Sequence, residues 1–142
     1  MEIEICHPDE ASRLLDLLER VGLPRNGLDD HLHCALVACS GDAVVGCAAV
    51  ECYGDAGLLR SVAVDAAYRG RGIGGALVDA AVDLARRRGV RTLYLLTTSA
   101  TAYFSRFGFR SIVREDVAFI VQQSVEFNGV CPVHAIVMQR DI

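Results

Sequence analysis

Hydrophobic and polar residues alternate in several short segments of the chain. Residues 2–6 alternate isoleucine with polar residues, and residues 33–39 and 43–51 are apolar runs separated by a Ser-Gly-Asp turn. Alternation over a few residues is typical of strands, and two such runs with a short turn between them predict a hairpin. Residues 57–64 follow another turn, so these segments predict an antiparallel meander.

Apolar residues recur at helical spacing in three other segments. Residues 8–21, 73–88 and 115–127 each place apolar side chains three or four positions apart, and a glycine follows the first two segments. This spacing gives a helix one apolar face, and a glycine often ends a helix. Shorter helices are expected at residues 27–32 and 101–107.

Three further apolar segments complete the predicted sheet. Residues 90–97 form a run rich in β-forming residues, and residues 109–113 and 132–139 are shorter strand candidates. The order of elements predicts an α/β (α+β) fold with a mixed, mostly antiparallel central sheet of about six or seven strands and helices on both faces. A β-α-β unit at residues 57–97 supplies the parallel pair.

Composition narrows the class of protein. The chain has 142 residues, 52% apolar and 23% charged, which excludes a disordered chain. This length suits a single domain over residues 1–142. The net charge of −4 makes a nucleic-acid partner unexpected, because such proteins are usually basic. The sequence shows neither a membrane-spanning run nor a signal peptide, so we expect a cytoplasmic protein with no membrane partner.

Six cysteines stand at positions 6, 34, 39, 47, 52 and 131. They lie mostly in or beside predicted strands, and their spacing differs from the short pairs that zinc sites favour. We therefore expect reduced thiols in the core and no resident metal, because free cysteine is among the most buried residue types. Ligation of a metal or metalloid by these thiols stays open as an alternative.

Residues 61–77 carry the most informative pattern in the chain. A strand ends at Val64, a loop with two arginines and several glycines follows, and an amphipathic helix begins. The first N–H groups of a helix lack intrahelical partners and lie at its positive end, so they bind anions such as phosphate or pyrophosphate. A flexible loop would explain the glycines but not Arg69 and Arg71. The pattern is neither a Rossmann fingerprint nor a Walker A loop.

Two motifs make the chain resemble the GNAT superfamily of acetyl-CoA-dependent N-acetyltransferases. The family has Arg/Gln-x-x-Gly-x-Gly/Ala after a strand ending in Val-x-Val, and this chain has Arg69-Gly70-Arg71-Gly72-Ile73-Gly74 after Val62-Ala63-Val64. The family's Ala-x-x-Phe/Tyr-x-x-x-Gly-Phe element is matched at residues 101–109. The order of elements also matches over nearly the whole chain.

The resemblance implies acetyl-CoA as cofactor and direct attack by the primary amine of a small molecule. It implies that residues 69–74 bind the coenzyme pyrophosphate and that the backbone of residues 62–64 pairs with the pantetheine arm. The strands ending near Val64 and Thr97 are expected to splay apart. The implied coenzyme-binding residues are Val62, Ala63, Val64, Arg69, Gly70, Arg71, Gly72, Ile73, Gly74, Gly75, Ser99 and Phe104.

A narrower resemblance concerns three short segments. Residues 58–65, residues 94–98 and Cys131-Pro132 are similar to the N-acetyltransferases of arsenic-resistance operons. Related enzymes act on glutamate-like amino acids that carry arsenic or phosphorus. The resemblance therefore implies an acceptor of that kind.

The chain departs from the family at two catalytic positions. Many relatives carry a tyrosine that protonates the departing thiolate where this chain has Phe104, whose ring has no proton to donate. Tyr103 is adjacent, but helical geometry turns it about 100° away, so we expect it to pack or to lie on the surface. Many relatives also carry a glutamate in the strand before the loop. Here Glu51 is the candidate general base, with a strand-end carboxylate in solvent as the alternative.

Arg60 lies in a strand of otherwise small and apolar residues. A buried arginine is rare unless it is paired. We expect it either to bind a substrate carboxylate through two hydrogen bonds or to form a structural ion pair with Glu51 or Glu4.

Two other functions stay open. A non-catalytic acyl-CoA-binding sensor or interaction module fits the missing tyrosine and glutamate, and a metalloid-binding protein fits the cysteines. The oligomeric state is open as well, with a homodimer as the first expectation because two-fold dimers are the commonest soluble homo-oligomers.

Overall fold

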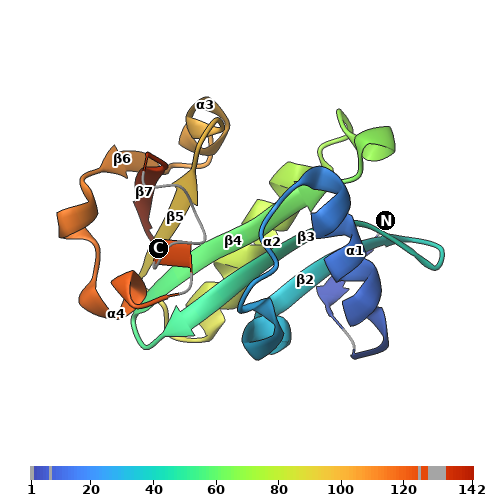
Figure 1. The fold of residues 1–142 in the computed structure, drawn as a ribbon, viewed down its shortest axis with the longest axis horizontal. Coiled ribbons are helices and arrows are strands. Elements are labelled where there is room, and N and C mark those ends of the chain that lie inside the picture. The colour runs from blue at the N-terminus through green and yellow to red at the C-terminus, as the bar shows by residue number, and fades with distance from the viewer. Residues whose placement is uncertain (1, 7, 125, 128–133) are drawn as a thin grey trace.

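The computed structural model describes residues 2–6, 8–124, 126–127 and 134–142, and Figure 1 shows the fold. Within these residues, seven strands form one sheet in the order β1-β2-β3-β4-β5-β7-β6. The β4–β5 pair is parallel and the other neighbours are antiparallel. The predicted mixed, mostly antiparallel sheet is therefore confirmed.

The strands are β1 (Glu2–Ile5), β2 (Ala35–Ser40), β3 (Ala43–Tyr53), β4 (Ala56–Val64), β5 (Thr92–Thr97), β6 (Arg110–Ile112) and β7 (Ile136–Asp141). The α-helices are α1 (Ala11–Val21), α2 (Ile73–Arg87), α3 (Thr101–Ser105) and α4 (Phe119–Gln122). Short 3-10 helices are η1 (Pro8–Glu10), η2 (Leu28–Cys34), η3 (Ala66–Tyr68) and η4 (Arg114–Asp116).

Helices cover both faces of the sheet (Figure 1). Leucines of α1 pack with Val37 and Ala49, while Leu77 of α2 packs with Leu36 and Val50, their neighbours along the same strands. Successive residues of a strand point to opposite faces, so α1 and α2 lie on opposite sides. Among the described residues, no helix is both long and apolar enough to cross a membrane.

Two irregularities of β4 determine its shape. The β3–β4 register shifts between Cys47 and Ala49, opposite Ser61, which has a left-handed φ of 59°. A non-glycine residue in that region is strained by about 1–3 kcal/mol, and the extra residue makes a β-bulge. The parallel pairing with β5 ends at Leu58 and Tyr94, although both strands continue. The predicted splay of these two strands is thus present.

The segment predicted as one helix at residues 115–127 is not one helix, and that prediction is wrong. Val117 and Ala118 have extended backbone between η4 and α4. This break lets both Val117 and Val121 join a small core with Leu58, while the Gln122 side chain donates a hydrogen bond to the Val117 carbonyl at 2.9 Å. Helical spacing alone does not reveal such a break.

Two other predicted boundaries also move. Residues 33–34, predicted in a strand, belong to η2, whose end is held by Arg88 through the His33 carbonyl. The strand predicted from residue 132 begins at Ile136. Cys131 and Pro132 lie outside the described residues.

Gly46 tests how closely α2 packs on the sheet. A Cβ at Gly46 would lie 2.9 Å from Leu77 Cδ1 and 3.3 Å from the Ala63 carbonyl oxygen. We expect Gly46→Val to lower the free energy of unfolding by about 1–3 kcal/mol, because overpacking forces the helix away from the strand. Ala43→Val, at an exposed position of the same strand, should change it by less than about 0.5 kcal/mol. Equal values from urea unfolding of the two variants would contradict this packing.

Candidate functional site

A cavity of about 840 Å³ lies between the end of β4, the start of α2 and α3. Its lining residues come from four parts of the chain: Val21, Leu23, Val62, Ala63, Val64, Tyr68, Arg69, Gly70, Gly72, Ile73, Gly74, Gly75, Ala100, Tyr103, Phe104, Arg106 and Phe107. Cavities that hold small-molecule ligands have volumes in this range.

The loop before α2 forms one end of the cavity. Gly70 and Gly72 both have a left-handed φ of 78°, and a Cβ at either position would meet nothing within 4 Å. Gly72 is the N-cap of α2, so the first N–H groups of this 15-residue helix follow it without intrahelical partners. Together with the positive end of the helix dipole and Arg69 on the cavity wall, they can hold an anion.

The end of β4 forms the wall next to this loop. Val62, Ala63 and Val64 line the cavity, and they lie beyond the point where β5 stops pairing with β4. The β5-facing edge of β4 is therefore not bonded to β5 here. Unpaired backbone groups at a strand edge can take up an extended ligand as an additional strand.

Two aromatic rings of α3 close the cavity. Phe104 is 9% exposed and packs in the core against α2, and it lines the cavity as well. Tyr103 also lines it, with its hydroxyl oxygen 2.5 Å from the position that a Cβ of Gly74 would take. Tyr103 packs against the core, as expected, and it contributes to the cavity wall as well. Burial raises the pKa of the Tyr103 hydroxyl, which stays protonated at neutral pH.

Most of the predicted coenzyme-binding residues lie together on this wall. Of the twelve, ten line the cavity. The Arg71 guanidinium instead lies 4.9 Å from the centre of the Tyr68 ring, and Ser99 is not among the lining residues that the structure describes. Sequence reasoning missed Val21 and Leu23, which reach the cavity because α1 ends there.

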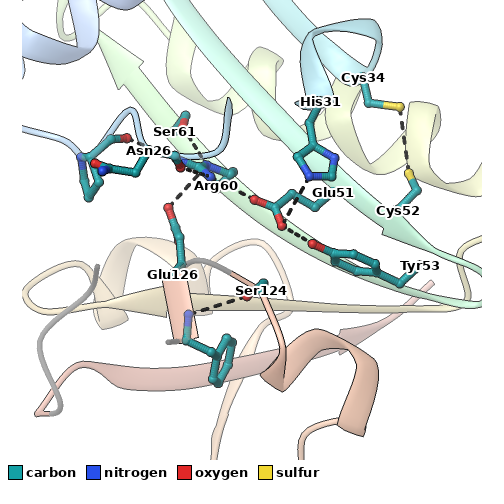
Figure 2. A network of polar contacts seen from close by, with 12 residues as sticks. Asn26, His31, Cys34, Glu51, Cys52, Tyr53, Arg60, Ser61, Ser124 and Glu126 are labelled. Carbon is teal, nitrogen blue, oxygen red and sulfur yellow. Dashed lines mark hydrogen bonds and ion pairs between the residues drawn. The ribbon is translucent and has the colours of Figure 1, made fainter. Parts of the chain in front are cut away.

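A buried polar network lies on the α1 face of the sheet (Figure 2). Its centre is Arg60, whose side chain is fully buried and which forms ion pairs with Glu51 at 2.8 Å and Glu126 at 3.3 Å. The guanidinium also donates hydrogen bonds to the carbonyls of Asn26 at 2.9 Å and Pro24 at 3.2 Å. Its Nε lies 3.1 Å from the hydroxyl of the bulge residue, Ser61.

This geometry bears on the two expectations for Arg60. The structural ion pair is present, and its partners are Glu51 and Glu126 rather than Glu4. Protein groups surround the guanidinium, and Arg60 is not among the described residues that line the cavity, so substrate binding by Arg60 stays a prediction. Glu126 was missed, because nothing in the local pattern of its segment distinguishes it from a surface acid.

Glu51 is 1% exposed, so the alternative of a carboxylate in solvent is wrong. Its carboxylate accepts a hydrogen bond from the Tyr53 hydroxyl and lies 3.7 Å from Nε2 of His31. Burial and the neighbouring Glu51 raise the pKa of Tyr53, so its hydroxyl remains a proton donor. His31, with 20% of its side chain exposed, links Glu51 to the surface.

The cysteines behave largely as core thiols. Cys6, Cys34 and Cys47 are buried, and Cys39 and Cys52 are half-buried. Cys39 lies near Glu4 and Glu10 with ligand atoms within 4.8 Å of one another. Burial and the hydrogen bond to Glu10 raise the pKa of Cys39 to about 11. A metal ion bound by this trio would have to displace the proton of the Cys39 thiol.

Comparisons of this chain with known proteins agree on one family. Residues 31–111 match the Acetyltransferase (GNAT) domain. The amino-acid acetyltransferase of Mycobacterium tuberculosis (strain ATCC 25618 / H37Rv) is 43% identical over 70 residues, which are 49% of this chain and 40% of the relative. The chain thus spans about two fifths of that curated relative's length.

Solved structures share the fold over the whole chain. Rv2747 from Mycobacterium tuberculosis, in complex with CoA and NLQ, has a TM-score of 0.84 at 26% identity, over 100% of this chain and 99% of that one. N-acetylglutamate synthase from Neisseria gonorrhoeae, complexed with coenzyme A and N-acetyl-glutamate, has a TM-score of 0.83 at 22% identity, over 99% of this chain and 34% of that one. With a family match over more than half of its residues, the chain belongs to the GNAT acetyltransferase family.

Proposed function

We propose that this protein is an acetyl-CoA-dependent N-acetyltransferase that acetylates the primary amine of a small amino acid. The observation that carries the proposal is the cavity, which joins an anion-binding helix start to the strand edge that β5 leaves unpaired. A coenzyme with a charged pyrophosphate and an extended amide-rich arm needs both features side by side.

The acceptor class rests on the relatives. A curated relative is an amino-acid acetyltransferase, and a structural neighbour is an N-acetylglutamate synthase. The similarity of residues 58–65 and 94–98 to enzymes of arsenic-resistance operons narrows the proposal to an amino acid that carries arsenic or phosphorus.

The residues of this chain suggest how the reaction proceeds. Residues 69–74 hold the pyrophosphate, and the edge of residues 62–64 aligns the thioester for direct attack by the amine. Because Phe104 has no proton to give, the thiolate takes its proton from water. We propose Glu51 as the base. Neither it nor His31 is among the described residues on the cavity wall, so the amine proton would reach Glu51 through water.

An acyl-CoA-binding sensor without turnover is the second candidate. The observation that favours it is the position of Glu51, which is bound to Arg60 and away from the cavity. One assay separates the acetyltransferase from the sensor. The protein is incubated with acetyl-CoA and a panel of amino acids that includes phosphinic and arsenic analogues, and the release of coenzyme thiol is measured. We expect steady release with at least one amino acid. Tight acetyl-CoA binding without release for any amine would favour the sensor.

Gly72→Asp tests the pyrophosphate position. The new side chain meets open space, so the fold should survive, but its carboxylate would repel an anion at the start of α2. We expect the Kd for acetyl-CoA by calorimetry to rise roughly ten- to hundredfold, the effect of losing one charge-assisted hydrogen bond. Gly72→Asn has nearly the same shape, tolerates a left-handed φ and adds no charge, so it should bind far more tightly than Gly72→Asp. Equal loss in both variants would assign the effect to backbone strain.

Tyr103→Phe tests whether a tyrosine next to the family position has become the general acid. The Tyr103 hydroxyl lies at the first turn of α2 rather than at the bulge of β4, so we expect kcat to fall by less than tenfold. The KM for acetyl-CoA should rise roughly two- to tenfold, the value of one neutral hydrogen bond. A loss of kcat by a thousandfold with intact folding would show that Tyr103 protonates the thiolate.

Arg60→Ala tests the buried network. Removing this partner leaves Glu51 and Glu126 without their cation, and breaking a buried pair costs about 3–5 kcal/mol of unfolding free energy. Arg20→Ala is the matched control, since Arg20 pairs with Asp65 at 3.1 Å on the surface and such pairs contribute less than about 1 kcal/mol. If Arg60→Ala unfolds like the wild type but raises the acceptor KM, Arg60 binds substrate after all.

A further inference from the structure

Two thiols lie side by side at the end of β3 that is remote from the cavity. Cys34 is the last residue of η2, directly before β2, and Cys52 is the second-last residue of β3. Their Sγ atoms are 3.9 Å apart (Figure 2). Cys34 is 1% exposed, whereas Cys52 is half-buried and accessible to a small reagent.

The sheet places these sulfurs within reach of a covalent bond. Ala35 pairs with Ala49, so Cys34 comes opposite Val50 and diagonal to Cys52 on the α2 face. A disulfide has an S–S length of about 2.05 Å, which leaves about 1.9 Å to close. Diagonal neighbours on adjacent strands are about 7–8 Å apart, so closing this distance takes a small backbone shift at the end of η2 together with side-chain rotation.

A positively charged side chain lies beside the Cys34 sulfur. Arg88 donates from Nη1 to the Cys34 sulfur at 3.3 Å and from Nη2 to the His33 carbonyl at 3.4 Å. The same positive charge would repel a metal ion, so oxidation fits this pair better than metal binding.

We propose that Cys34 and Cys52 are a modification site that forms a reversible disulfide with hydrogen peroxide as oxidant. Cys52 sulfur attacks one peroxide oxygen and becomes a sulfenic acid, and the other oxygen leaves as water. The Cys34 sulfur then attacks Cys52, the S–S bond forms, and the second oxygen leaves as water. The two thiols lose two electrons and two protons in total, and one peroxide is reduced to two waters.

The bond would connect the end of η2 to β3 beside the buried network. His31 lies in η2 and Glu51 directly precedes Cys52, so both sides of the His31–Glu51 contact become fixed. Burial and the neighbouring Cys34 raise the pKa of Cys52 to about 12. The reaction is therefore slow at neutral pH and needs an excess of peroxide.

The test is oxidation of the reduced, full-length protein with hydrogen peroxide, followed by digestion after Asp and Glu without reductant. Cleavage then yields residues 31–42, which hold Cys34 and Cys39, and residues 52–55, which hold Cys52. We expect these two peptides to be linked, with a mass about 2 Da below their sum, and to separate after reduction. Tandem mass spectrometry of the linked pair should place the bond at Cys34.

Matched variants identify the two sulfurs. Cys52→Ser and Cys34→Ser should each abolish the link, and Cys39→Ser, which removes the other thiol of the same peptide, should keep it. If Cys34→Ser fails to fold, the masses of the linked wild-type peptides still test the proposal. A link through Cys39, Cys47 or Cys131, or oxygen added to Cys52 without any link, would overturn the proposal. Its failure would leave the acetyltransferase proposal untouched, because neither sulfur lines the cavity.

Discussion

The buried guanidinium of Arg60 is the constraint on which the α1 face of this fold depends. A cation removed from water costs several kcal/mol unless its N–H groups and its charge are met by the protein. Here Glu51 comes from β3, Glu126 from the C-terminal segment and two carbonyls from the connection after α1. One side chain thus forces four distant parts of the chain into a single arrangement.

The same side chain connects this network to the cavity. Its Nε lies against the hydroxyl of Ser61, the residue whose left-handed backbone makes the bulge in β4. The Cys47 thiol donates a hydrogen bond to the Ser61 carbonyl at 3.1 Å from the other strand. Contacts on both sides therefore stabilise a strained backbone, and beyond the bulge β4 runs apart from β5. The cavity wall at residues 62–64 is a consequence of that separation.

Local patterns were enough to predict most elements. The predictions of an apolar face on α2 and of a glycine that ends α1 were both correct. Both depend on interactions within a few residues, namely helical spacing and a left-handed glycine. Ten of the twelve residues inferred for the coenzyme lie on one cavity wall, since a single loop and its flanking elements contain nearly all of them.

Tertiary contacts account for what the sequence did not reveal. The apolar neighbours of Arg60 in the sequence indicated that its side chain is paired. They did not indicate Glu126 as a partner, because Glu126 lies more than sixty residues away and reaches Arg60 only through the tertiary fold. The helix predicted at residues 115–127 fails for a similar reason, since Val117 and Val121 reach the same core only through an extended break. Tyr103 turned inward because Gly74 leaves room for its hydroxyl.

The cavity has two unlike ends, and this difference sets a direction for its ligand. Arg69 and the start of α2 supply positive charge at the loop, whereas Val21, Leu23 and Val62 contribute apolar wall. The binding free energy of an anionic group is most favourable beside the positive charge. The desolvation of an uncharged arm costs least beside apolar side chains. Under the proposed function, the pyrophosphate therefore anchors at α2 and the thioester points along β4. That direction brings the reacting carbon toward the bulge at Ser61, the part of β4 whose geometry Arg60 holds.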